Sequence, residues 1–249
     1  MTQEIKTQKI EKKIYILSSV SSETPEVALV KLVPEDMHAL DFEPGMFIMI
    51  SGLDAQTGKT YVARAFSVAS DPAAQEMELF VVKVHDNHTT HFLESKSGDK
   101  YLIVGPHGQF RFKPETDKKV VFIAGGTGLA PFMSMLRYIN RLRTGTDVAL
   151  LYSVKYPDEI IKKDELAGFE SSIGAKIVIT VTRPDEGSDA APWDGEKGHV
   201  DANMIKRHIA DYADRIFYVC GPLGFVKAVS EAISSLGVEK GRIKADVWG

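Results

Sequence analysis

The chain has 249 residues, of which 44% are hydrophobic and 26% are charged, and its formal net charge is −4. These values are typical of a soluble globular protein with one large domain or two ordinary ones, and they give no electrostatic reason to expect nucleic acid or an anionic membrane as partner. No apolar run approaches the roughly 20 residues of a membrane span, and the polar start has no signal-peptide core, so we expect a cytoplasmic protein without membrane insertion.

Short β-rich runs fill the chain up to about residue 112. Prolines and glycines separate them at an even spacing, which favours an antiparallel barrel or sandwich. The predicted strands are residues 13–20, 26–33, 46–52, 62–69, 77–84 and 101–105.

The fourth of these runs carries residue types suited to a ligand. Arg64 can grip phosphate oxygens with two parallel hydrogen bonds, Phe66 offers a flat face, and Ser67 offers a short donor and acceptor. An ordinary strand with one surface arginine explains the same stretch, so it decides nothing alone.

After residues 113–119 the pattern changes to alternating strands and helices. Strands are expected at 120–125, 147–154, 175–183 and 215–221, with a possible last strand at 242–248, and helices at 131–143, 158–169, 201–212 and 225–237. This alternation predicts a doubly wound parallel sheet. The predicted domains are residues 1–114 and 115–249.

In the junction IAGGTGLAPF, glycines leave the backbone without side chains at the point where a buried strand is followed by a helix. Gly126, Thr127 and Gly128 are suited to a pyrophosphate, because N–H groups point outward at a helix start, and Pro131 suits the first helical turn. A tight turn that merely needs glycine is the competing interpretation.

A second junction, YVCGPLGF, puts Cys220 at the end of a later strand. A lone thiol there is more often a small buried hydrophobic group than a catalytic one. As the single cysteine it also excludes an intrachain disulfide and a cluster bound by four cysteines of this chain.

Four motifs in order resemble the ferredoxin–NADP reductase superfamily. They are RAFSVAS at 64–70, GPHGQF at 105–110, GGTGLAP at 125–131 and CGP at 220–222. The resemblance implies an antiparallel β-barrel that binds FAD, followed by a Rossmann-like α/β domain that binds NADPH or NADH.

The resemblance also implies roles for individual residues. Arg64 would hold the FAD pyrophosphate, Phe66 would lie against the isoalloxazine in place of the usual tyrosine, and Ser67 would bond near the ring nitrogen that accepts hydride. The cofactor-binding residues it implies are Arg64, Ala65, Phe66, Ser67, Val82, Lys83, Val84, Thr89, Thr90, Gly126, Thr127, Gly128, Pro131, Arg183, Cys220, Gly221 and Pro222.

The catalytic residues implied are Ser67, Cys220, Asp246 and Trp248. Cys220 would border the nicotinamide as a shaped wall and not as a nucleophile. Trp248 would cover the flavin face and Asp246 would assist near the reacting ring, although a tryptophan that anchors the last strand is an equal alternative. Arg183 and Lys155 lie at predicted strand ends and favour NADPH over NADH as the nucleotide.

The stretch VKVHDNHTTHFL contains His85, His88 and His91 at intervals of three. Along a strand, turn and helix this spacing does not converge three imidazoles, so no metal site is predicted. In the superfamily this position holds a turn and a short helix near the flavin pyrophosphate. Asp86 and Asn87 would then form the turn, and Thr89 or Thr90 would cap the helix.

The predicted function is an NAD(P)H-dependent FAD flavoprotein reductase that passes electrons to a separate acceptor, either a ferredoxin-like protein, a flavodoxin or an oxygenase component. Two alternatives stay open: a reductase that uses flavin as a substrate, and an electron-transfer subunit that is inactive outside a larger complex. The acceptor, the direction of electron flow and the oligomeric state are not predicted.

Overall fold

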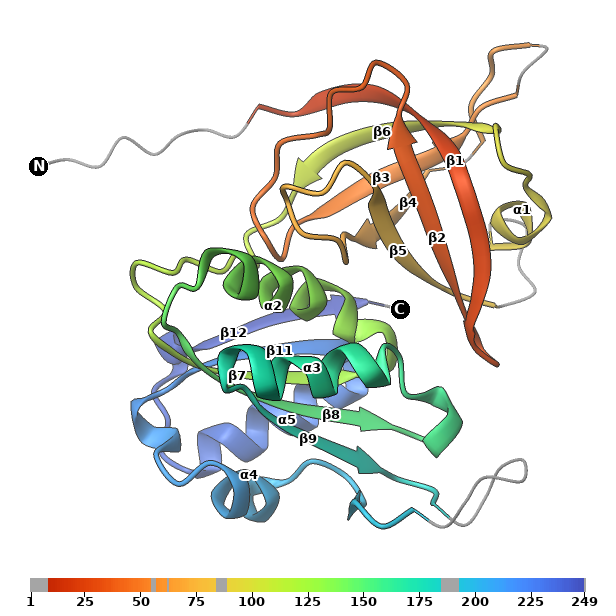
Figure 1. Cartoon of the computed structure of the whole chain (residues 1–249). Coiled ribbons are helices and arrows are strands. Elements are labelled where there is room, and N and C mark those ends of the chain that lie inside the picture. Colours follow the sequence, from red (N-terminus) through yellow and green to blue (C-terminus); the bar gives the residue numbers. More distant parts are fainter. Residues whose placement is uncertain (1–8, 55–56, 62, 84–88, 185–192, 249) are drawn as a thin grey trace, which may run out of the picture.

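A computed structural model describes residues 9–54, 57–61, 63–83, 89–184 and 193–248. Figure 1 shows a β-barrel stacked on an α/β domain, with the barrel formed by the first half of the chain. This is the fold class that the sequence predicts.

The barrel is a six-stranded antiparallel sheet in the order β4-β3-β6-β1-β2-β5, which curls until it is nearly closed. One short helix, α1, follows β5. The bounds are β1 Glu11–Thr24, β2 Val27–Pro34, β3 Phe47–Gly52, β4 Arg64–Ser67, β5 Met77–Val82, α1 Thr89–Glu94 and β6 Lys100–His107.

Alternation along these strands fills the barrel with apolar side chains. Ile48, Leu79 and Ile103 are fully buried on three different strands, as expected when every second residue faces the core. The buried Tyr15 hydroxyl accepts a hydrogen bond from the N–H of Leu40 at 2.8 Å. The barrel therefore has its own core.

The second domain is a six-stranded parallel sheet in the order β10-β9-β8-β7-β11-β12. The strands are β7 Lys119–Gly125, β8 Asp147–Val154, β9 Lys176–Val181, β10 Glu196–Lys197, β11 Ile216–Pro222 and β12 Ile243–Trp248. The helices are α2 Ala130–Leu142, α3 Lys163–Ile173, α4 Ala202–His208 and α5 Leu223–Ser235, and the 3-10 turns are η1 Gly126–Leu129, η2 Pro157–Glu159, η3 Tyr212–Asp214 and η4 Lys240–Arg242.

Two cores, one on each face of this sheet, hold the helices in place. Phe132 of α2 and Leu166 of α3 pack on one face, while Met204 of α4 and Val229 of α5 pack on the other. The sheet strands are buried on both faces and are accordingly almost continuously apolar.

The barrel sits on the α2 face of the sheet. Val27 and Phe80 of the barrel share one core with Phe132 of α2. The Tyr218 hydroxyl of β11 donates to the carbonyl of Arg111, in the segment that joins the domains, at 2.9 Å. The two domains therefore pack as one body.

The helix predicted at residues 158–169 is misplaced. Pro157–Glu159 form the η2 turn, Ile160 and Ile161 are buried, and Lys162 has a left-handed backbone with φ of 52°. Because the chain turns at Lys162, α3 begins only at Lys163 and ends at Ile173. The possible last strand is confirmed as β12, and the described residues contain no helix with the length and apolarity that crossing a bilayer requires.

Candidate active site

Two strand ends and one turn form the floor of the site. β7 ends at Gly125 and η1 begins at Gly126, which has a φ of 54° and open space where a side chain would project. Gly128 is packed so closely that an added Cβ would lie 2.3 Å from the carbonyl oxygen of Cys220. Glycine is therefore required at position 128 for η1 to lie against β11.

A cavity of about 740 Å³ opens above this floor, between the barrel and the α/β domain. Its walls come from both domains, with Val27 and Val82 from the barrel. The residues that line it are Glu26, Val27, Val82, Gly125, Gly126, Thr127, Ser153, Val154, Lys155, Glu159, Ile161, Thr182, His199, Val200, Pro222, Gly224, Phe225, Ala228, Val229 and Trp248.

Phe225, on the first turn of α5, supplies an aromatic wall that the sequence analysis missed. Its ring lies over two bare strand ends, because a Cβ added at Gly125 or Gly221 would approach it to 3.0 Å or 2.8 Å. A side chain at either position would push the Phe225 ring away from the strand ends. The signal in the sequence was the aromatic residue three positions after the CGP motif.

Polar groups gather where β8 and β9 end. Lys155 follows β8 and lines the cavity, and its N–H donates to Glu159 Oε2 at 3.0 Å. Arg183, after β9, donates from Nη1 to the Tyr156 hydroxyl at 3.3 Å and is not among the cavity residues. His199, exposed beside β10, is a further polar cavity residue that the sequence analysis missed.

Cys220 and Asp246 are direct neighbours on β11 and β12. Cys220 is 1% exposed, and burial, together with the Asp246 carboxylate, raises the pKa of its thiol well above its usual range. Burial likewise raises the pKa of Asp246. Cys220 is a neutral, buried thiol, so it is not a nucleophile in this state.

The C-terminal strand carries Trp248 to the cavity. Its parallel partner is Pro222, and both residues line the cavity. The Trp248 side chain keeps 39% of its surface exposed, and Val247 and Leu223 beside it are also exposed. Trp248 is therefore not a core anchor in this chain.

The edge strand β4 presents the predicted flavin residues. Arg64 and Ala65 are exposed, whereas Phe66 and Ser67 are half-buried. The Phe66 ring meets Phe92 of α1 edge-on at a centroid distance of 5.7 Å, and Phe92 stacks on Tyr101 at 4.9 Å. These rings hold α1 beside β4.

The segment after β5 is only partly described. Val82 ends β5, and the Lys83 ammonium donates to the Ser22 hydroxyl and to the carbonyls of Thr24 and Pro25 at 2.7–3.1 Å. The predicted short helix is confirmed as α1, which begins at Thr89 and includes Thr90. Val84, His85, Asp86, Asn87 and His88 lie outside the described residues, and the described ranges hold no cluster of three metal-ligating side chains.

The residues present fit the two cofactors that the motifs imply. The floor at Gly126 and Thr127 leaves backbone bare toward the cavity, so a diphosphate can approach its N–H groups. On the barrel, β4 pairs an exposed arginine with a half-buried aromatic face, which suits a charged, flat ligand.

Two domain families match the chain. Residues 13–112 match the oxidoreductase FAD-binding domain, and residues 122–231 match the oxidoreductase NAD-binding domain. Together they cover most of the barrel and most of the α/β domain.

Characterised relatives are reductases and reductase subunits. The chain is 30% identical over 219 residues to NADH-cytochrome b5 reductase 1 of Emericella nidulans. The matched region covers 84% of this chain and 69% of that protein. It is 27% identical over 212 residues to the glycine betaine monooxygenase reductase subunit of Chromohalobacter salexigens, over 84% of this chain but only 56% of the relative. The chain thus spans little more than half the length of the latter.

Solved structures share the fold across both domains. A ferredoxin reductase in carbazole 1,9a-dioxygenase superposes with a TM-score of 0.82 at 24% identity, over 98% of this chain and 71% of the other. A ferredoxin NADP+ reductase from Neisseria gonorrhoeae with bound FAD and NADP gives a TM-score of 0.78 at 24% identity, over 95% and 98%.

Proposed function

This chain belongs to the ferredoxin–NADP reductase superfamily, and on that premise we propose that it is an NAD(P)H-dependent flavoprotein reductase that delivers electrons to a separate acceptor. The observation that carries the proposal is the cavity between the domains, lined by the glycine-rich turn of one domain and by strand ends of the other. We take residues 1–114 as the flavin-binding part and 115–249 as the nucleotide-binding part.

The bound cofactors supply the redox chemistry, with the nicotinamide giving a hydride to the flavin and the flavin releasing electrons onward. The protein supplies binding and alignment. Gly126 and Thr127 would offer N–H groups to the nucleotide diphosphate, and Lys155, after β8, adds a cationic residue to the cavity lining. Arg64 would balance the charge of the flavin diphosphate, and Phe66 and Ser67 would contact the flavin ring system.

The end of the cavity beside β11 and β12 excludes water around the reacting rings. Phe225, Pro222 and Trp248 give it an apolar lining, and Cys220 is a neutral neighbour behind that wall. Trp248 is exposed enough to move aside, so we assign it the role of covering the flavin face until the nucleotide enters. Asp246 is the carboxyl group nearest this wall on β12.

The acceptor is a protein that takes electrons, either ferredoxin-like or an oxygenase component. Several relatives carry names such as glycine betaine monooxygenase reductase subunit and propane 2-monooxygenase reductase component. The 249 residues contain one cysteine, which cannot ligate an iron–sulfur cluster alone. The electrons therefore leave these two domains for a separate redox centre.

One observation favours a second candidate, a reductase that uses flavin as a substrate. Phe66 keeps a stacking face but lacks the hydroxyl of the tyrosine usual in the superfamily. Retention of yellow colour through desalting argues against this second candidate, and its complete loss supports it.

The proposal is tested by steady-state kinetics on the purified chain with FAD added. We expect NADH or NADPH to reduce ferricyanide at a rate that saturates with nucleotide and requires flavin. A chain that reduces ferricyanide with neither nucleotide would exclude autonomous reductase activity and would leave the subunit of a larger complex as the function.

A further inference from the structure

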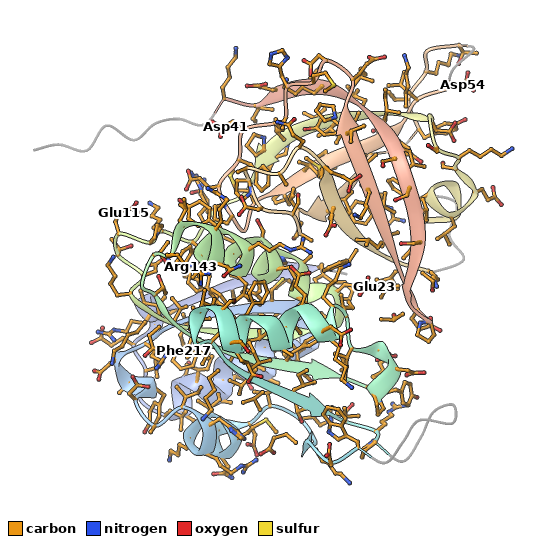
Figure 2. All side chains as sticks on the ribbon, viewed as in Figure 1. Glu23, Asp41, Asp54, Glu115, Arg143 and Phe217 are labelled. Atoms are coloured by element: carbon orange, nitrogen blue, oxygen red, sulfur yellow. The ribbon has the colours of Figure 1, made fainter. Side chains whose placement is uncertain are left out.

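The β1–β2 hairpin of the barrel reaches the nucleotide-binding domain. β1 pairs with β6 only through Glu11–Ile16, but its pairing with β2 continues as far as Thr24 opposite Val27. Figure 1 shows the tip of this hairpin extending from the barrel toward the segment between β8 and α3. Glu23, labelled in Figure 2, lies there between the two domains.

Glu23 is held by two donors of a single residue. The Lys162 N–H donates to Glu23 Oε1 at 2.9 Å, and the Lys162 ammonium lies 3.0 Å from Oε2. Both side chains are largely shielded, with 15% of Glu23 and 18% of Lys162 exposed, so water weakens the ion pair less than at the surface. We call this contact the hairpin clasp.

The backbone at Lys162 is adapted to the clasp. Its φ of 52° and ψ of 38° are left-handed, a conformation that residues other than glycine adopt seldom and with backbone strain. Such conformations persist where surrounding contacts hold them. Here the left-handed turn aims the N–H of Lys162 at the barrel immediately before α3 begins.

The clasp lies at the rim of the cavity on both sides. Glu159 and Ile161, just before Lys162, line the cavity from the α/β domain, and Glu26 and Val27, just after Glu23, line it from the barrel. The wall therefore passes from one domain to the other at the clasp. Any loosening there changes the distance between the two walls.

We infer that Glu23 and Lys162 are positioning residues for the nicotinamide nucleotide: the hairpin clasp sets the width of the cavity at the end formed by β8 and the hairpin. The inference rests on the proposed function, because it takes the cavity as the nucleotide site. Within the described part of the chain, neither clasp residue bonds directly to a predicted flavin residue. Lys83 holds Ser22 and Thr24, on either side of Glu23, without Lys162. Breaking the clasp therefore leaves that hold in place and weakens nucleotide binding more than flavin binding.

A second interdomain ion pair provides a matched control. Arg141 Nε of α2 lies 2.9 Å from Asp71 Oδ2 of the barrel, and neither residue lines the cavity. Asp71→Asn keeps the oxygen that accepts the Ala73 N–H and removes the interdomain charge pair. Loss of this ion pair affects the packing of the two domains, but it changes no residue that lines the cavity.

The test compares Glu23→Gln, Lys162→Gly, Lys162→Arg and Asp71→Asn in the flavin-loaded protein. Lys162→Gly keeps the left-handed backbone, which glycine adopts freely, and keeps the N–H that donates to Glu23, but it removes the side chain with its ammonium. Calorimetric titration with NAD⁺ and with NADP⁺ gives the dissociation constants, and flavin absorbance gives the cofactor content.

We expect both clasp variants to weaken binding of the preferred nucleotide about fivefold or more, a difference of roughly 1 kcal/mol, with unchanged flavin content. The dissociation constant of Asp71→Asn should stay near that of the wild type. Lys162→Arg keeps a cation at this position, so it should bind the nucleotide about as tightly as the wild type. Wild-type affinity in both clasp variants, or an equal loss in Asp71→Asn, overturns the inference while leaving the proposed function standing. A wild-type protein that binds neither nucleotide overturns both.

Discussion

Among single residues, Gly128 is the one whose identity the packing fixes most narrowly. A methyl group there would lie 2.3 Å from the Cys220 carbonyl oxygen, well inside van der Waals contact. We predict that Gly128→Ala lowers the free energy of unfolding by about 1–3 kcal/mol or more, since η1 and β11 must move apart. Thermal denaturation measures the change.

Gly126→Ala is the matched control on the same turn. Gly126 has a φ of 54° but nothing within 4 Å of an added Cβ, so only backbone strain is introduced. The cost should be about 1 kcal/mol, or roughly 2–4 °C in Tm for a chain of this size. If Gly126→Ala destabilises as much as Gly128→Ala, the close contact between η1 and β11 is not the reason for glycine at position 128.

At the scale of elements, Arg137 of α2 joins the barrel to the α/β domain. Its guanidinium donates to Glu78 of β5 at 2.7 Å, to the Ala69 carbonyl at 2.9 Å, and to both oxygens of Glu165 on α3 at 2.6 and 2.8 Å. Burial opposes ionisation of Glu78, but the Arg137 cation, together with Lys162 and Lys31, outweighs burial and lowers the pKa of that carboxyl below its usual value. The folded state therefore favours ionised Glu78.

This lowered pKa predicts how stability depends on pH. The contribution of Glu78 is fully present above the pKa of an unfolded glutamate, near 4.5, and is lost as the pH falls through the lower folded pKa. Glu78→Gln should therefore destabilise the protein at pH 7 and reduce the loss of stability on acidification below about pH 5. Urea denaturation of both proteins from pH 7 to pH 3 measures the two slopes, and parallel curves would show that Glu78 is not ionically coupled to the cations around it, Arg137, Lys162 and Lys31.

Local sequence patterns predict most elements but not the segment before α3. Ile160 and Ile161 have apolar spacing that suits a helix, yet both are buried outside α3, and the left-handed Lys162 separates them from the helix. That break is held by Glu23, which lies 139 positions away in the chain. A contact between segments so far apart leaves no local pattern, so sequence reasoning placed the helix too early.

On the scale of the whole molecule, local motifs again predict one part of the site, and contacts between distant segments create the rest. Motifs with a fixed local spacing located the glycine-rich turn and the CGP strand end, both of which line the cavity, whereas the β4 residues do not line it. Glu26, His199 and Phe225 reach the cavity only because the hairpin, β10 and α5 converge on it, and no motif marks that convergence. The roles of Arg64, Ser67, Arg183 and the C-terminal residues stay predictions that ligand binding has to test.

The central claim is that one cavity between the domains brings a nicotinamide nucleotide to a flavin on the barrel. The most direct measurement is a visible spectrum of the purified protein, followed by anaerobic titration with NADH and then with NADPH. We predict flavin absorbance that bleaches with about one equivalent of the preferred nucleotide, because one hydride reduces one flavin. Absence of flavin absorbance even after incubation with FAD, together with no bleaching by either nucleotide, would contradict the account.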